Sequence, residues 1–495
     1  MMDKILIGGC ALLPLLAQAA TSGPGPGAAQ MASDVCAVRV RSVALVDAAL
    51  ARADAVARLN AFTTVDAAGA RQAAARLDAS DARRRCGPLA GVPIVVKDNI
   101  DVAGLPTTAG TPALLKNVPR ADAPVVERLR RAGAIVLAKT NMHELAFGIS
   151  GWNETFQSGP APGVRNAWST DHMAGGSSSG SGAAVGAQVV AIALGTDTGG
   201  SVRIPCAFNG CASLRPTVGR YPSGGIVPIS RTRDTAGPMA ASMVDLELVD
   251  RVISGAGRTA PARLDGLRLG RVPALLEHLD DDTRVAYLST LAKLQAAGVQ
   301  IIDVPLPGLQ QLNGQVGFPL ALYEAYDDMQ RYLRQSGSGV TIDQLAAAIR
   351  SPDVKVTYQG LVLPRKLPGP NNSVVDAKPA YDAAMATARP ALQALYREGF
   401  RRHRVDALIF PTVPKVAMAA EPGASSLANF LATIQNTDPG SNAGLPGLQL
   451  PMGLGLSSGL PVGLELDGPP GSDRRLIAIG LAIEAVVGRL PAPPR

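Results

Sequence analysis

Two short runs of glycine and hydroxyl residues stand inside an apolar stretch of the chain. Residues 174–185 read AGGSSSGSGAAV, and residues 195–203 read GTDTGGSVR. Glycine permits positive φ and a close approach of the backbone, and serine provides a hydroxyl that can attack a carbonyl or carry a proton. The pattern predicts two walls of a serine active site. It leaves open which serine attacks and which group takes its proton.

The composition is that of an ordinary globular protein with ample material for a core. The chain has 495 residues, of which 47% are hydrophobic and 18% are charged. The formal net charge is +7, but the basic residues are scattered or in short bursts without interleaved aromatic residues. This distribution favours a solvated surface over a nucleic-acid interface, so we expect no nucleic-acid partner.

The first 20 residues have the pattern of a secretory signal peptide. Lys4 precedes an apolar run over 5–16, and Ala17-Gln-Ala19 fits an A-x-A cleavage site. We expect cleavage near Ala19-Ala20, a flexible leader over 21–40, a single domain over 41–495, and a periplasmic or secreted protein. No later apolar run reaches the roughly 18 residues that a membrane span requires.

Four cysteines follow this segment. In an oxidising compartment Cys36 could pair with Cys86, and two free thiols are an equal alternative. Cys206 and Cys211 are interpreted as small packing residues. No cluster of histidine and cysteine has zinc spacing, so no metal is expected.

Helical and strand patterns alternate along much of the chain. Apolar residues recur at helical spacing over 42–57, 67–77, 123–132 and 473–487. Short apolar runs predict strands over 91–96, 134–138, 189–194, 405–410, 448–452 and 460–466. Residues 219–238 are rich in glycine and proline and predict a loop, and residues 311–400 predict a helix-rich region. The alternation indicates an α/β protein with a buried sheet.

One interpretation of the first run is the nucleophile elbow of an α/β-hydrolase, because residues 176–180 fit G-x-S-x-G centred on Ser178. That elbow requires a strand directly before it, whereas residues 166–174 have the composition of a loop. Only His278 and His403 follow the run, and neither lies in a segment of active-site character. We therefore interpret the match as accidental.

Lysine is the next candidate for the base. Lys97 closes the apolar run 91–96 and could lie at the carboxyl end of a buried strand, where open α/β sheets bind ligands. Burial disfavours the ammonium form, and a neutral amine can accept a proton. From the residues alone, a surface lysine that ends a strand is the favoured interpretation, because most lysines are exposed.

Together these motifs resemble the amidase signature hydrolases. The resemblance spans about residues 40–490. The matching segments, in chain order, are 91–104, 175–185, 195–205, 406–412 and 459–463. It implies the amidase signature fold, a large mixed β-sheet covered by α-helices on both faces, and a reaction without a cofactor.

The resemblance also implies a catalytic triad. Ser201 would be the nucleophile, Ser177 in a cis peptide bond would relay protons, and Lys97 would be the neutral base. The two serines are 24 residues apart, which agrees with the family interval.

Further residues take supporting roles by the same resemblance. The backbone amides of Thr198, Gly199, Gly200 and Ser201 would form the oxyanion hole, where small residues leave the donors unobstructed. Ser178, Asp197 and Arg203 are expected to brace the loops.

Other segments are similar to members that hydrolyse aryl acetamides, such as indoleacetamide and mandelamide hydrolases. They are residues 141–148, 215–222, 226–230 and 233–238. Phe147, Trp152 and Phe156 could line an apolar acyl pocket, and ordinary core packing is the alternative.

These inferences favour an exported serine amidase of the class that hydrolyses linear amides. It would cleave the C–N bond of a small aryl or apolar acyl amide through an acyl-enzyme, releasing a carboxylate and ammonia or an amine. The expected partner is the small amide itself, and a homodimer is compatible with the sequence. Two alternatives stay open: the amidase subunit of a tRNA-dependent amidotransferase, and a non-catalytic amide-binding protein on the same scaffold.

Overall fold

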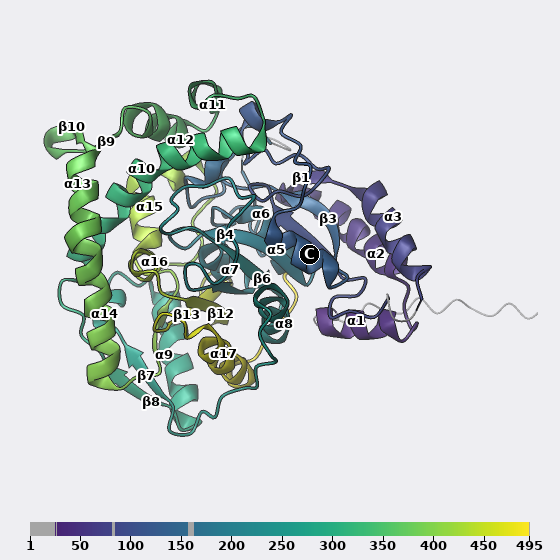
Figure 1. Cartoon of the computed structure of the whole chain (residues 1–495). Helices are drawn as coiled ribbons and strands as arrows, with labels where there is room; N and C mark the ends of the chain where they lie inside the picture. The colour runs from purple at the N-terminus through teal and green to yellow at the C-terminus, as the bar shows by residue number, and fades with distance from the viewer. Residues whose placement is uncertain (1–24, 26, 82–84, 157–162, 495) are drawn as a thin grey trace, which may run out of the picture.

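A mixed sheet of 11 strands runs through the chain (Figure 1). The computed structural model describes residues 25, 27–81, 85–156 and 163–494, so the expected signal peptide over 1–20 lies outside the described residues. Across the sheet the order is β1 (Phe62–Val65), β3 (Ile135–Thr140), β2 (Pro93–Lys97), β4 (Ile192–Asp197), β6 (Thr235–Ala240), β5 (Ala212–Arg215), β12 (Gly447–Leu454), β13 (Pro461–Asp467), β11 (Ala407–Pro411), β7 (Arg268–Arg271) and β8 (Gln300–Asp303). A separate hairpin pairs β9 (Lys366–Pro368) with β10 (Val374–Asp376).

Parallel and antiparallel pairings both occur in the large sheet. Strand β2 runs parallel to β3 and to β4, and β7 runs parallel to β11 and to β8. The remaining neighbours are antiparallel, including the predicted late strand pair β12 and β13. The parallel pairing brings the carboxyl ends of β2, β3 and β4 to one edge, where ligands bind in open α/β sheets.

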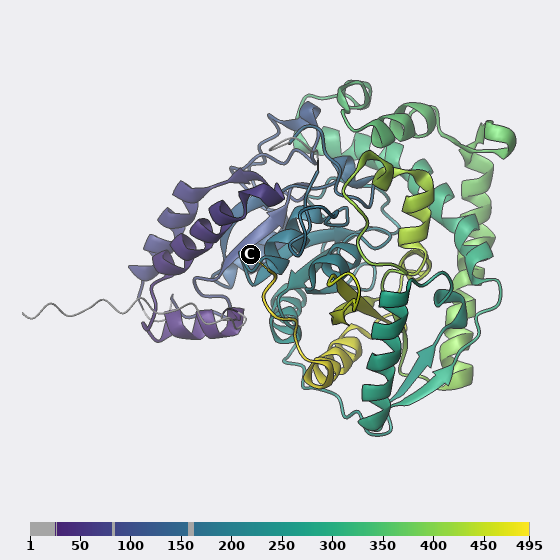
Figure 2. The same cartoon turned by 180° about the vertical axis from the view of Figure 1, so that it is seen from behind.

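Helices connect the strands and cover the sheet. In chain order they are α1 (Ala28–Cys36), α2 (Ser42–Ala55), α3 (Ala67–Asp78), α5 (Pro124–Arg131), α6 (Ser179–Gly186), α7 (Arg203–Asn209), α8 (Met243–Ser254), α9 (Asp281–Ala296), α10 (Leu309–Ser336), α11 (Ile342–Ala348), α12 (Pro352–Thr357), α13 (Ala377–Ala383), α14 (Arg389–His403), α15 (Leu427–Ile434), α16 (Asp438–Ala443) and α17 (Asp473–Val487). Figures 1 and 2 show α2 and α3 at one end of the molecule and α13 and α14 at the other.

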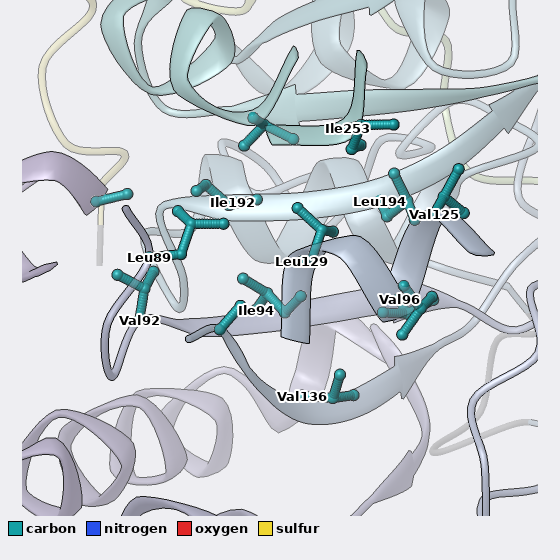
Figure 3. Packing of buried hydrophobic residues seen from close by; sticks show 14 of the residues in the cluster. Leu89, Val92, Ile94, Val96, Val125, Leu129, Val136, Ile192, Leu194 and Ile253 are labelled. Atoms are coloured by element: carbon teal, nitrogen blue, oxygen red, sulfur yellow. The ribbon is translucent and has the colours of Figure 1, made fainter. Parts of the chain in front are cut away.

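Both faces of β2 are buried, because successive side chains of a strand point to opposite sides. Ile94 and Val96 pack with Leu129 of α5 and Ile253 of α8 on one face (Figure 3). Val95 packs on the other face with residues of α2, α3 and α6. The predicted α/β class, with a mixed sheet covered on both faces, is confirmed.

The expectation of a flexible leader over 21–40 is wrong for residues 28–36, which form α1. Ala28, Met31 and Val35 are buried on one side of this helix. Their spacing of three and four residues places them on one face, and this face joins the cluster that contains α5 and α8. The Ala28 amide also donates a hydrogen bond of 2.8 Å to Asp245 Oδ1 in α8.

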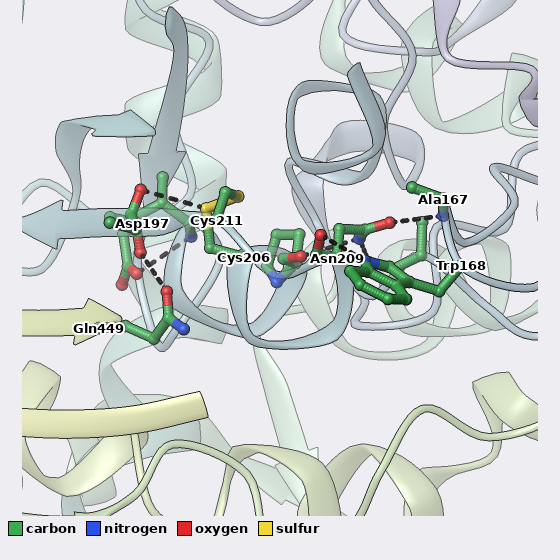
Figure 4. The surroundings of a disulfide bond; sticks show 12 residues. Ala167, Trp168, Asp197, Cys206, Asn209, Cys211 and Gln449 are labelled. Atoms are coloured by element: carbon green, nitrogen blue, oxygen red, sulfur yellow. Dashed lines mark hydrogen bonds between the residues drawn. A yellow bond between two sulfur atoms is a disulfide. The ribbon is translucent and has the colours of Figure 1, made fainter. Parts of the chain in front are cut away.

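The cysteines form two disulfides. Cys36 is bonded to Cys86, one of the two alternatives that the sequence left open. Cys206 and Cys211, expected to be packing residues, are also bonded to each other (Figure 4). Gly210, with φ of +76°, ends α7 in the left-handed conformation and turns the chain back, so that the two Cα atoms lie 4.6 Å apart.

The predicted loop over 219–238 ends earlier than expected, because β6 begins at Thr235. Pro238 lies within this strand opposite Leu194 of β4. Proline has no amide proton to give to a neighbouring strand. The pairing of β6 with β5 covers only Met239 and Ala240, so Pro238 interrupts no bond on that side.

Within the part of the chain that the structure describes, no helix combines the length and the apolar character needed to cross a membrane.

Candidate active site

Lys97 is the last residue of β2, and its side chain is buried. Its Nζ lies at hydrogen-bond distance from two hydroxyls, 2.8 Å from Ser177 Oγ and 2.8 Å from Thr196 Oγ1. Thr196 also accepts a hydrogen bond of 3.1 Å from Asn99 Nδ2. The lysine is therefore held by neutral groups at the edge of the sheet.

This environment changes the acidity of the lysine. Burial lowers the pKa of Lys97 from the usual 10.5 to about 7, and the charges of Asp197 and Asp234 only partly oppose the shift. A pKa near 7 leaves a large share of the amine neutral at neutral pH, so Lys97 can act as a general base.

Ser177 lies in the first glycine-serine loop, directly before α6. The peptide bond between Gly176 and Ser177 is cis. A side chain at Gly176 would lie 3.0 Å from the carbonyl oxygen of Gly148. The loop around Gly148 therefore packs directly on the peptide that carries Ser177.

Ser201 lies in the second loop, between β4 and α7, and faces a large cavity. Its carbonyl accepts a hydrogen bond of 3.1 Å from the Ser178 amide. Ser178 Oγ in turn donates to the Thr196 carbonyl at 3.1 Å. Ser178 thus ties the two loops together. Among the described residues, nothing forms a hydrogen bond with Ser201 Oγ, and the hydroxyl is available to a bound substrate.

One of the four predicted oxyanion donors has another partner. The Gly200 amide donates a hydrogen bond of 2.8 Å to Asp197 Oδ1, so its expected role in the oxyanion hole is wrong. The amides of Thr198, Gly199 and Ser201 are the remaining candidates. Gly200 is required in its place for another reason: its φ is +138°, and a side chain there would lie 2.3 Å from Thr437 Oγ1.

A buried charge network holds this loop. The Asp197 carboxylate accepts hydrogen bonds from Arg203 at 3.1 Å and from Arg215 at 3.1 Å. Arg203 also donates to Glu465 at 2.9 Å. Burial opposes ionisation of Asp197, but the two guanidinium groups outweigh it and hold the pKa of this carboxyl well below its usual range. Asp197 and Arg203 therefore lie where a bracing role requires.

Three residues that contact the catalytic loops have no role in the sequence-based prediction: Thr196, Arg215 and Asp234. Burial raises the pKa of Asp234 to about 6, and its carboxylate accepts a hydrogen bond of 2.6 Å from Thr198 Oγ1. Thr196 and Arg215 lie within or beside recognised motifs, but only the sheet pairing shows which way their side chains reach.

The cavity beside Ser201 has a volume of about 910 Å³. Most of its wall is apolar, and it includes Phe147, as the sequence suggested. Trp152 and Phe156, both described, are not part of the wall. The Trp152 ring instead donates a hydrogen bond of 3.3 Å to Glu154 Oε1. The aromatic residues that the sequence did not single out are Phe318 of α10 and Phe430 of α15.

Helix α15 carries a sequence signal that could have identified this wall. Leu427, Phe430, Leu431 and Ile434 recur at spacings of three and four residues and all line the cavity. Such spacing predicts one apolar helix face, but it does not say what the face covers.

No metal centre is found in the residues with described placement, because no three or more histidine, cysteine or acidic side chains are gathered there in a way that could hold an ion.

The chain is similar to known proteins over most of its length. The family model described as Amidase matches residues 44–477. The chain is 48% identical over 461 residues to a mandelamide hydrolase of Pseudomonas putida, covering 92% of this chain and 90% of the relative. It is 40% identical over 451 residues to an indoleacetamide hydrolase of Agrobacterium vitis, and the match covers 90% of this chain and 93% of the relative. The solved structure of a peptide amidase from Stenotrophomonas maltophilia superposes with a TM-score of 0.79 at 31% sequence identity. The match covers 94% of this chain and 98% of that structure's chain.

Replacing Asp197 by alanine should unfold the protein at much lower denaturant concentration or temperature. The change leaves Arg203 and Arg215 buried without this carboxylate, and breaking a buried pair typically costs about 3–5 kcal/mol of unfolding free energy. Thermal unfolding followed by circular dichroism measures the effect. Asp281→Ala, which breaks an exposed pair with Arg284, is the control and should leave the transition unchanged. Equal transitions for the two variants would contradict a bracing role for the buried network.

Proposed function

The chain belongs to the amidase family and hydrolyses amides, and from this premise we propose that the reaction proceeds through an acyl-enzyme on Ser201. One observation carries the proposal. A buried lysine with a pKa of about 7 lies 2.8 Å from Ser177 Oγ, while the Ser201 hydroxyl, in the adjoining loop, opens to the cavity.

In the proposed acylation, neutral Lys97 accepts the proton of Ser177 while Ser177 accepts that of Ser201. The Ser201 oxygen then attacks the amide carbon, and the C–O bond forms as the carbonyl electrons move to oxygen. Backbone amides of Thr198, Gly199 and Ser201 are the donors for this oxyanion. The proton returns through Ser177 to the leaving nitrogen, because an amine departs poorly unless it is protonated.

Deacylation reverses the relay. A water molecule loses a proton to Ser177 as Ser177 passes its own to Lys97, and it attacks the ester carbon of acyl-Ser201. The carboxylic acid is released and ionises to the carboxylate in water. The proton passes back to the Ser201 oxygen as the ester bond breaks. Lys97 ends the cycle in its neutral state, and no external base is consumed.

We propose that the acyl group is aryl or otherwise apolar. This assignment is supported by the apolar cavity wall, which includes Phe147, Phe318 and Phe430. It is also supported by the names of two relatives, a mandelamide hydrolase at 48% identity and an indoleacetamide hydrolase at 40% identity. The test of the reaction is release of ammonia from phenylacetamide by the purified protein, and absence of ammonia across a broad panel of amides would contradict it.

We propose, further, that the protein is exported and that the mature chain begins near Ala20. The pattern of residues 1–20 supports this, as do two disulfides, which persist mainly in oxidising compartments.

Ser201→Ala should lower kcat by about 10⁴- to 10⁶-fold, because it removes the attacking oxygen. Ser179→Ala is the matched control, since it changes a buried serine at the start of α6 whose hydroxyl has no hydrogen-bond partner among the described residues. It should retain activity. Ammonia release under saturating phenylacetamide measures both. Substantial turnover by the Ser201 variant would mean that another group attacks.

The pH profile should follow the charge of Lys97. With a pKa of about 7, kcat/KM should rise up to pH 7 and level off above about pH 8, since only the neutral amine accepts a proton. At pH 6 the rate should be about a tenth of the plateau, the neutral fraction one unit below the pKa. Lys97→Met should lose most activity and this rising limb. A residual activity with the wild-type profile would assign the base to a different residue.

Export can be tested by intact-mass analysis of the protein expressed in a bacterial host and recovered from the periplasm. The expected mass is that of a chain starting near Ala20 with two disulfides, which lower the mass by about four hydrogens. Recovery of the full-length chain only in the cytosol would overturn the proposed localisation.

A further inference from the structure

One carboxylate lies in the largely apolar wall of the cavity, outside the catalytic residues. Asp353 is the second residue of α12 and lines the cavity beside Pro352 and Val356. Its Oδ2 lies 3.0 Å from Nε2 of His143. Its Oδ1 is shielded from solvent, yet no described residue donates a hydrogen bond to it.

The His143 ring lies against this carboxylate. The imidazole is fully buried, and its Nδ1 lies 3.4 Å from Ser150 Oγ. Ser150 Oγ is 2.6 Å from Ser425 Oγ, and Ser425 also lines the cavity. Gly148 passes so close over the ring that a side chain there would lie 2.1 Å from Nε2. The ring therefore has little freedom to move away from Asp353.

The carboxylate is kept in its ionised form. Burial favours the neutral acid, but His143 and nearby backbone amides outweigh this and lower the pKa of Asp353 below its usual value. An ionised carboxylate can only accept hydrogen bonds. A buried acceptor without a donor is unfavourable, so a ligand that brings a donor gains the energy of a charge-assisted bond.

An aromatic wall adjoins the same position. Phe147 packs edge-on against Tyr358, with ring centroids 5.1 Å apart. Tyr358 directly follows α12 and is buried behind the wall, while Phe147 and Asp353 both line the cavity. This combination suits a planar aromatic group with one polar hydrogen.

We propose that Asp353, positioned by His143, is an acceptor subsite that selects amides whose aromatic acyl group carries an N–H or O–H donor away from the scissile bond. The inference rests on the proposed function of Ser201 and names the substrate class that this site prefers. Asp353 touches the substrate and determines specificity, and it takes no part in the proton relay.

Two substrates of closely similar shape test this subsite. Indole-3-acetamide carries a ring N–H, and benzothiophene-3-acetamide has sulfur in its place. The wild-type protein should hydrolyse the indole compound with a kcat/KM about 10- to 100-fold higher, the range expected for one hydrogen bond to a charged acceptor. Asp353→Ala should bring the ratio close to one, because it removes the acceptor that favours the indole compound.

Asp343→Ala is the matched control. It also removes an acidic residue from the first turn of a short neighbouring helix, α11, but this side chain is exposed and does not line the cavity. It should keep the wild-type ratio. Benzothiophene-3-acetamide reports whether the Asp353 variant is folded and active, because this compound has no ring N–H to donate to the carboxylate.

A wild-type ratio near one would overturn the inference, as would an equal loss on both substrates in the Asp353 variant. If Asp353→Ala does not fold, the wild-type ratio still decides. Failure of the proposed amidase reaction has a different signature, since then neither substrate releases ammonia from any variant.

Discussion

The burial of one lysine among hydroxyl groups is the interaction on which the rest of the centre depends. Two lysines are fully buried at the ends of neighbouring parallel strands, Lys97 on β2 and Lys139 on β3. Lys139 Nζ lies 3.2 Å from Asp98 Oδ1, so its charge is compensated. Lys97 has hydroxyls as its hydrogen-bond partners instead. Burial lowers the pKa of both lysines, but among the described residues only Lys139 of the two has a carboxylate within ion-pair distance. Lys139 pairs with Val96 and Lys97 with Thr140, so the two side chains point to opposite faces of the sheet.

A neutral base of this kind is useful only if the serines around it are fixed. The loop that carries Ser201 is held by the Asp197 carboxylate, which binds the Gly200 amide and two buried guanidinium groups. Ser178 then links this loop to the one that carries Ser177. The charged side chains of Asp197, Arg203 and Arg215 therefore hold the loop in its shape, while the groups proposed to react are neutral.

The sequence predicted the parts of this centre that depend on neighbouring residues in the chain. The short β-branched run before Lys97 is a strand because both its faces are buried, and the two glycine-serine loops lie where the motif places them.

The acyl cavity could not be predicted in the same way. Its walls come from α10 and α15, about 110 and 230 residues beyond Ser201, and only tertiary packing decides what an apolar helix face covers. Trp152 is near the loops in sequence, yet its ring lies away from the cavity wall. The Cys206–Cys211 bond depends on the turn at Gly210, and α1 depends on a face of α8, so neither follows from composition.

The loop over 143–150 contacts both the proposed relay serine and the proposed acceptor subsite. The His143 amide donates a hydrogen bond of 3.2 Å to the carbonyl of Ser177, while its imidazole contacts Asp353 at the cavity wall. In the same loop, Phe147 lines the cavity, and Gly148 packs against both the His143 imidazole and the Gly176–Ser177 peptide. A residue change that widens the acyl wall here would therefore also move the support of the relay serine. For this reason changes in acyl preference should be easier to accommodate on the cavity-lining faces of α10 and α15 than on this loop.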